Sequence, residues 1–162
     1  MIARYSPLAV FLLLVVSASY LATGFEAGEW YHVTMRQPSW TPPHWLYGPA
    51  WALVYVMMAL SAWKIWMTGH YSRMGALTWW VLLLMLNVAW SALLFSLHRP
   101  GWALPVLGLT LGITVFCMRS FGRVAGDAAL LMTPYLLWIA FLAVLNLAIW
   151  GANGSFLEHL FV

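Results

Sequence analysis

Five apolar segments, each long enough to cross a lipid bilayer, constrain the fold of this chain more than any other feature. They cover approximately residues 6–25, 46–66, 76–97, 102–120 and 128–150. A helix needs about 20 mainly apolar residues to span the hydrocarbon layer. No Asp, Glu, Lys, Arg or His lies deep inside any of these segments. The sequence therefore predicts an all-α integral membrane protein, folded over residues 1–162 as a single bundle of five transmembrane helices.

The composition supports this assignment and argues against several classes of function. Charged residues make up 7% of the chain and apolar residues 64%, whereas a soluble domain carries roughly 25% charged residues. The net charge of +3 comes from scattered basic residues, which does not indicate nucleic-acid binding. The single cysteine, Cys117, excludes an internal disulfide and a four-thiolate metal site. We therefore expect the lipid bilayer as a partner, and no nucleic acid.

The ionisable residues also bear on transport and on metal binding. An ion-coupled transporter usually places a charged residue inside a span, so the uncharged spans disfavour that function. The histidines stand at positions 32, 44, 70, 98 and 159, all near loops or span ends. They are interpreted as solvated loop residues. As an alternative, the four histidines other than His70, which share one side of the membrane, are candidate axial ligands of a haem. We predict no metal site and no required cofactor.

The basic residues predict the orientation of the chain in the membrane. Arg4, Lys64, Arg73, Arg119 and Arg123 lie on the side of the N-terminus, against Arg36 and Arg99, with Glu26, Glu29 and Glu158, on the other. The positive-inside rule then places the N-terminus in the cytoplasm and the first loop outside. Long apolar helices favour a bacterial inner membrane. The first segment could be a signal peptide, but its length favours a retained helix.

Several polar and aromatic residues within the spans fall at helical spacing. Trp51 shares a helix face with Tyr55, and Asn87 shares one with Trp90 and Ser91. In the fifth span the corresponding residues are Trp138, Leu142 and Leu145, with Asn146 above them. These faces could line one cavity beneath the first loop. Asn87 and Asn146 then either bond neighbouring helices or orient the polar edge of a ligand in an apolar pocket.

The stretch "QPSWTPPHW" at residues 37–45 leads into the second span. Each proline fixes φ near −65° and disfavours helix in the residue before it, so we expect a stiff, extended segment. It would present Trp40 and Trp45 either as interfacial anchors or as a lid over an apolar pocket. Further along, Pro134 removes one backbone hydrogen bond from the fifth span, which predicts a kink just below Trp138.

Three segments of the chain resemble the tryptophan-rich sensory protein (TspO/MBR) family. They are "EWYHVTMRQPSWTPPHWLYGPAWALVYVMM" at 29–58, "NVAWSALLF" at 87–95 and "DAALLMTPYLLWIAFLAVLN" at 127–146. The resemblance implies a five-helix bundle, usually a homodimer, with a pocket that the first loop caps. It also implies binding of tetrapyrroles such as protoporphyrin IX or haem, and of isoquinoline and benzodiazepine ligands.

The resemblance favours a membrane receptor or sensor for tetrapyrroles, with a light-dependent porphyrin-degrading enzyme as the alternative and a sterol or porphyrin transporter as a weaker one. It implies Tyr31, Trp51, Asn87 and Trp138 as pocket residues, and Trp51 with Trp138 as the photochemical pair. The predicted ligand-binding residues are Tyr31, Trp40, Trp51, Tyr55, Asn87, Trp90, Ser91, Trp138, Leu142 and Asn146.

The chain departs from the family pattern at two places. Leu83 stands where many relatives carry a glutamine four residues before the asparagine, so one polar contact is missing. The segment "LNLAIWGANG" at 145–154 lacks the tyrosine and the basic residue of the family's sterol motif, which argues against tight cholesterol binding.

Overall fold

The structure is a bundle of long apolar helices. The computed structural model describes residues 2–25 and 30–154, so Glu26, Glu29, Glu158 and His159 lie outside the described residues. Five helical segments are long and apolar enough to cross a membrane: Ser6–Thr23, His44–Met67, Arg73–Ser96, Pro100–Gly122 and Gly126–Ala152. The described residues contain no strand. The predicted fold class, an all-α membrane bundle of five spans, is confirmed.

The individual elements are as follows. The long helices are α1 (Ile2–Thr23), α2 (Tyr47–Met67), α3 (Arg73–Ser91), α4 (Pro100–Gly122) and α6 (Thr133–Ala152), with the short α5 (Gly126–Leu131) before α6. Three short turns complete the chain: the π-helical η1 (Trp30–Thr34), the 3-10 helix η2 (His44–Leu46) that leads into α2, and the π-helical η3 (Ala92–Ser96) that extends α3.

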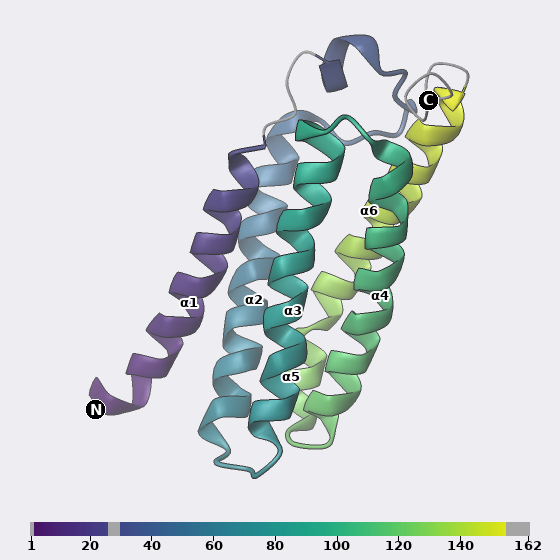
Figure 1. Ribbon diagram of the computed structural model, residues 1–162. Coiled ribbons are helices and arrows are strands. Elements are labelled where there is room, and N and C mark those ends of the chain that lie inside the picture. The colour runs from purple at the N-terminus through teal and green to yellow at the C-terminus, as the bar shows by residue number, and fades with distance from the viewer. Residues whose placement is uncertain (1, 26–29, 155–162) are drawn as a thin grey trace.

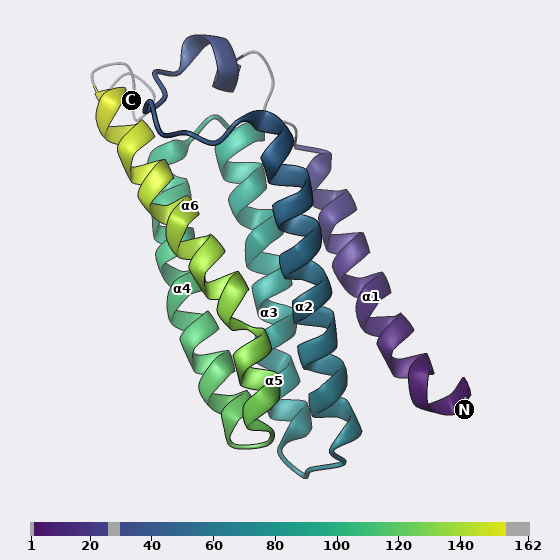
Figure 2. The same cartoon turned by 180° about the vertical axis from the view of Figure 1, so that it is seen from behind.

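The helices form a closed ring of neighbours. Helix α1 packs against α2 and α3, α4 packs against α3 and α6, and α2 closes the ring through α5 and α6. Figures 1 and 2 show the helices running side by side, with the start of α1 leaning away from the bundle. The segment that includes η1 crosses the end of the bundle where α6 finishes, opposite the start of α1 (Figure 1).

The fifth span is interrupted close to Pro134. Helix α5 ends at Leu131, and α6 begins at Thr133 with Pro134 in its first turn. At the break, the Met132 N–H bonds to the Ala129 carbonyl at 3.1 Å, a tighter i−3 bond than an α-helix makes. Because proline has no N–H to donate, the regular ladder cannot continue through this point. The sequence predicted a kink just below Trp138, and the structure has a break between α5 and α6 at that place.

The half of the bundle that holds the start of α1 has a packed core around Trp80. This side chain is fully buried, and its indole N–H donates to the Met58 carbonyl at 3.1 Å. Phe11 of α1 packs edge-on against the same ring, with 5.4 Å between ring centroids. The bond and the ring contact together join α1, α2 and α3 in this half.

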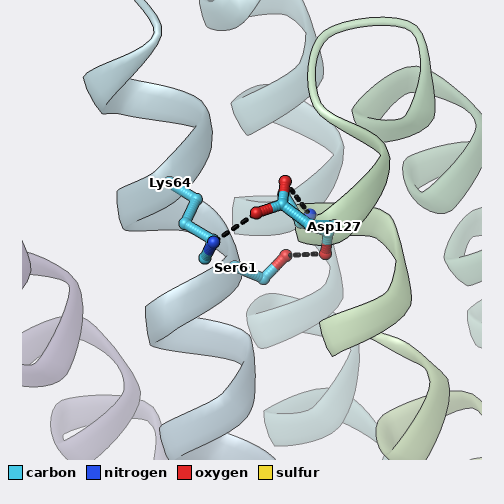
Figure 3. Close-up of polar contacts among 4 residues, drawn as sticks. Ser61, Lys64 and Asp127 are labelled. Carbon is cyan, nitrogen blue, oxygen red and sulfur yellow. Dashed lines mark hydrogen bonds and ion pairs between the residues drawn. The ribbon is translucent and has the colours of Figure 1, made fainter.

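Polar contacts join α2 to α5 in the same half (Figure 3). The Ser61 hydroxyl donates to the Ala128 carbonyl at 2.6 Å, and Lys64 forms an ion pair with Asp127. The Asp127 carboxylate also accepts the Ala128 N–H at 2.9 Å. Both charged side chains are partly exposed, so the ion pair orients the helices more than it stabilises them.

Candidate functional site

A cavity of about 470 Å³ lies at the end of the bundle where α1 and α6 finish and α2 begins. Its walls come from α1, α2, α3, η3 and α6, with Tyr31 of η1. Pockets that bury a drug-sized ligand range over roughly 300–1,000 Å³. Eight predicted residues line it: Tyr31, Trp51, Tyr55, Asn87, Trp90, Ser91, Leu142 and Asn146. The structure thus brings together three helix faces that the sequence identified separately.

Two predicted residues, Trp138 and Trp40, are not among those that line the cavity. Trp138 packs edge-on against Trp51 with 6.1 Å between centroids, so it contacts the cavity wall from behind. Its indole N–H is buried and has no hydrogen-bond partner. Trp40 is 48% exposed and contacts Phe141 of α6 at 6.1 Å. Trp138 therefore contacts a lining residue, and Trp40 contacts α6, without lining the cavity.

Several lining residues were missed by the sequence analysis. On α2, Gly48 and Ala52 lie three residues before Trp51 and Tyr55, so helical spacing could have found them. On α1 and just beyond its end, the lining residues are Ser19, Ala22, Thr23 and Phe25. The first span is almost uniformly apolar, and no pattern in it marks one face.

The most exposed lining residues mark the rim of the cavity. They are Thr23 at the end of α1 and His44, Gly48 and Ala52 along the start of α2. A Cβ atom added at Gly48 would meet nothing within 4 Å. The cavity is therefore most accessible along the facing edges of α1 and α2, where most of the side chains are small.

Three buried side chains in the cavity wall have polar atoms without a hydrogen-bond partner among the described residues. Asn87 accepts a bond from the Tyr135 hydroxyl at 3.0 Å, but its Nδ2 has none. The indole N–H of Trp90 and both polar atoms of Asn146 also lack partners. These residues are between 3% and 7% exposed. A buried polar group without a partner costs about 1–3 kcal/mol, so three of them in one wall suit a polar ligand.

Aromatic rings contribute to the remaining wall. Trp51 lies 5.0 Å from Tyr55 and 6.5 Å from Trp90 between centroids. Tyr31 meets Phe95 edge-on at 5.3 Å. Burial, with a smaller contribution from Tyr47, raises the pKa of the Tyr31 hydroxyl well above its usual range, so it is neutral at physiological pH. The arrangement offers flat, uncharged faces to a flat aromatic ligand.

The segment Met35–Pro43, here called the strap, runs from η1 to the start of α2. It contains no helix or strand and makes a turn at Ser39–Trp40, where the Thr41 N–H bonds to the Pro38 carbonyl at 3.0 Å. Pro43 has φ −61° and ψ 144°, as expected for the stiff entry to the second span. The backbone of Pro43 agrees with the predicted extended entry, whereas the turn at Ser39–Trp40 and the 3-10 helix over His44–Leu46 depart from it.

Side-chain bonds fix the strap to the rest of the molecule. Asn153, at the end of α6, accepts the Arg36 N–H and donates to the Arg36 carbonyl, both at 3.0 Å. The same amide donates to the Ile149 carbonyl at 2.7 Å. Within the loop, Gln37 Nε2 donates to the Tyr31 carbonyl at 2.8 Å. These bonds hold Tyr31 and the strap against the cavity end of the bundle.

The described histidines do not converge. His44 lies at the cavity rim, whereas the His98 ring packs against Trp30 at 4.3 Å and that of His70 against Tyr71 at 4.4 Å. Within residues 2–25 and 30–154, no three His, Cys, Asp or Glu side chains are grouped so that they could hold a metal ion.

The sequence was compared with known families and proteins. Residues 8–151 match the model of the TspO/MBR family. The chain is 35% identical to "Tryptophan-rich protein TspO" of Chlorobaculum tepidum, over 82% of this chain and 90% of that protein. It is 34% identical to "Translocator protein" of Bos taurus, over 91% and 90%, and 30% identical to "Protein CrtK" of Rhodobacter capsulatus, over 90% and 91%.

Proposed function

The chain belongs to the TspO/MBR family of integral, multi-pass membrane proteins, and we propose that it is a receptor or sensor that binds tetrapyrroles such as protoporphyrin IX in the cavity beneath the strap. The observation that carries the proposal is the set of unpartnered polar groups on Asn87, Trp90 and Asn146 within an aromatic wall. A tetrapyrrole combines a flat apolar body with polar atoms, and this wall is complementary to both.

The proposed binding mode combines aromatic contacts with hydrogen bonds from amide side chains. Trp51, Tyr55 and Trp90 supply aromatic faces, and burial of each large aromatic contact contributes on the order of 1–3 kcal/mol. The amides of Asn87 and Asn146 fix the orientation of the ligand. Isoquinoline and benzodiazepine compounds, which are flat and carry carbonyl groups, fit the same description. Haem is a further candidate ligand, and the proposal requires no resident cofactor.

Filling the cavity provides the direct test. Gly48 lines the rim with open space beside it, so Gly48→Phe should fold normally, occupy the cavity and abolish quenching of tryptophan fluorescence by protoporphyrin IX. Gly108→Phe on α4 is the matched control, because Gly108 is also exposed, has equally open space and does not line the cavity. Binding that survives in a folded Gly48→Phe protein would place the ligand elsewhere.

A light-dependent porphyrin-degrading enzyme is the second candidate function. It is favoured by the contact between Trp51, which lines the cavity, and Trp138 behind it at 6.1 Å. Phenylalanine keeps most of the apolar area but removes the easily oxidised indole. We expect Trp51→Phe and Trp138→Phe to bind within about tenfold of wild type, which is about 1.4 kcal/mol, and to bleach protoporphyrin IX much more slowly under light. Bleaching at the wild-type rate by both variants would argue that the indoles only pack.

The orientation, membrane and assembly state are part of the same proposal. The excess of basic residues on the side of the N-terminus supports a cytoplasmic N-terminus and a cavity that faces the outer side of a bacterial inner membrane. A reporter fused after Val162 should then be active only outside the cytoplasm. The proposal includes a homodimer, which mass measurement in detergent would test.

A further inference from the structure

A second, smaller cavity lies within the strap itself. It has a volume of about 350 Å³ and is lined by three prolines of the strap together with Tyr31, Gln37, Thr41, His44 and Tyr47. We call it the polar pocket. Tyr31, His44 and Tyr47 also line the large cavity, so the two spaces share a wall. The large cavity is mainly apolar, whereas all five residues that line the polar pocket beside the prolines carry a polar group.

Two hydroxyls of the polar pocket are buried without a hydrogen-bond partner. They are Thr41 Oγ1 and the Tyr47 hydroxyl. Threonines in the helices of this protein behave differently, because Thr110 and Thr114 each donate to the carbonyl four residues earlier at 2.7 Å. Thr41 follows the turn at Ser39–Trp40 and is not part of a helix, and its hydroxyl makes no such bond. Gln37 is held by its bond to the Tyr31 carbonyl, which leaves its second N–H for another acceptor.

The hydrogen-bond donors around the polar pocket suit a negatively charged guest. The pocket wall contains the imidazole of His44 and hydroxyl and amide groups that can donate. The strap prolines hold these groups in place before any ligand arrives. A carboxylate bound here would also stay at the end of the bundle, so it need not enter the apolar interior.

We propose that the polar pocket is a second ligand subsite, which binds a carboxylate of a molecule whose flat apolar body occupies the large cavity. For tetrapyrroles this inference rests on the function proposed above, and it sets the orientation of the ligand. The edge that bears carboxylates points toward Thr41 and Tyr47, and the macrocycle lies in the large cavity. The protein then selects carboxylate-bearing ligands over apolar analogues of the same shape.

A pair of matched ligands tests the subsite. Protoporphyrin IX carries two carboxylates, whereas etioporphyrin is a porphyrin with alkyl groups only. Hydrogen bonds to a charged group are among the strong ones, so wild type should prefer protoporphyrin IX by about tenfold or more. In the double variant Thr41→Val, Tyr47→Phe this preference should fall severalfold, because the affinity for protoporphyrin IX falls much more than the affinity for etioporphyrin.

Matched variants separate recognition from packing. Thr78→Val combined with Tyr71→Phe removes the same two kinds of hydroxyl from the outside of the bundle, and should leave the preference unchanged. Thr41→Ser keeps a hydroxyl and should keep the preference. If the double variant does not fold, Thr41→Val alone is compared with Thr41→Ser. An unchanged preference in the hydroxyl-deletion variant, or an equal loss of affinity for both porphyrins, would overturn the subsite.

A second pair of probes separates this inference from the proposed function. Pyrenebutanoic acid and butylpyrene differ in the carboxylate and are not tetrapyrroles. If wild type binds neither porphyrin but prefers pyrenebutanoic acid in a manner that depends on Thr41 and Tyr47, the tetrapyrrole function is wrong and the subsite stands. If porphyrins bind without any dependence on the carboxylate, the function stands and the subsite is wrong. If none of the four compounds binds, both are wrong.

Discussion

Trp80 and Trp90 are both buried on α3, yet their indole N–H groups have opposite environments. Trp80 donates to the Met58 carbonyl at 3.1 Å, whereas Trp90 has no partner. Trp80 lies in the half of the bundle that holds the start of α1, and Trp90 lies in the wall of the large cavity. Two tryptophans on one helix therefore differ in hydrogen bonding and in location, although the sequence around each is similarly apolar.

The same contrast holds for other polar side chains. Ser61 is fully buried and donates to the Ala128 carbonyl, while Asn146 is 3% exposed and makes no hydrogen bond. In an apolar medium a polar group that holds helices together must be paired. An unpaired one lowers stability unless something else binds it. Unpartnered buried polar atoms are thus found in the half that we propose to bind a ligand, whereas Ser61 and Trp80 in the other half are paired.

The largest effect is expected in the half of the bundle that holds Trp80. Trp80→Ala removes a fully buried side chain and leaves a cavity, so the free energy of unfolding should fall by about 3–5 kcal/mol. Trp79→Ala is the control, because Trp79 is 36% exposed and contacts Phe116 on the outside. Thermal unfolding in detergent measures both. The contrast between the two halves would be lost if Trp80→Ala left stability unchanged and reduced ligand affinity instead.

The next effect concerns the contact between the strap and α6. Asn153→Ala removes both bonds to Arg36, each worth about 0.5–1.5 kcal/mol. We expect protoporphyrin IX to dissociate about tenfold faster, and the Arg36 amide to exchange its hydrogen faster. Asn153→Asp keeps an acceptor for the Arg36 N–H but loses the donor, so it should also dissociate faster. Dissociation at the wild-type rate with faster amide exchange would show that ligand release does not require the strap to open.

The sequence was sufficient for the spans and for much of the large cavity. Bilayer thickness and composition act locally along the chain, so apolar length alone located all five segments. Helical spacing then grouped Trp51 with Tyr55 and Asn87 with Trp90. The bond from Asn153 to Arg36 joins residues 117 positions apart, and no local pattern predicts such a contact. The polar pocket depends on the fold of the strap for the same reason.

A smaller effect separates the two cavity asparagines. Asn146→Leu replaces an amide without partners, so the free energy of unfolding should stay equal or rise by up to about 1 kcal/mol while the affinity for protoporphyrin IX falls. Asn87→Leu also breaks the bond to Tyr135, so it should lower stability as well as affinity. Thermal unfolding and fluorescence titration of both variants give the two quantities. A loss of stability in Asn146→Leu equal to that in Asn87→Leu would mean that Asn146 acts in helix packing.

The smallest effect tests whether the strap is a lid or only an interfacial anchor. Replacing Pro42 and Pro43 with glycine loosens the free strap, and each proline restrains the chain by about 0.4–1 kcal/mol. The bonds from Asn153 to Arg36 stay in place, so the added cost appears when a ligand orders the strap. We expect protoporphyrin IX to dissociate severalfold faster with little change in association. Alanine at both positions should give an intermediate rate, because alanine is more restricted than glycine. If a folded double-glycine variant kept the wild-type dissociation rate, we would interpret the strap as an interfacial anchor only. The difference between the two halves of the bundle would then lie in the helices alone.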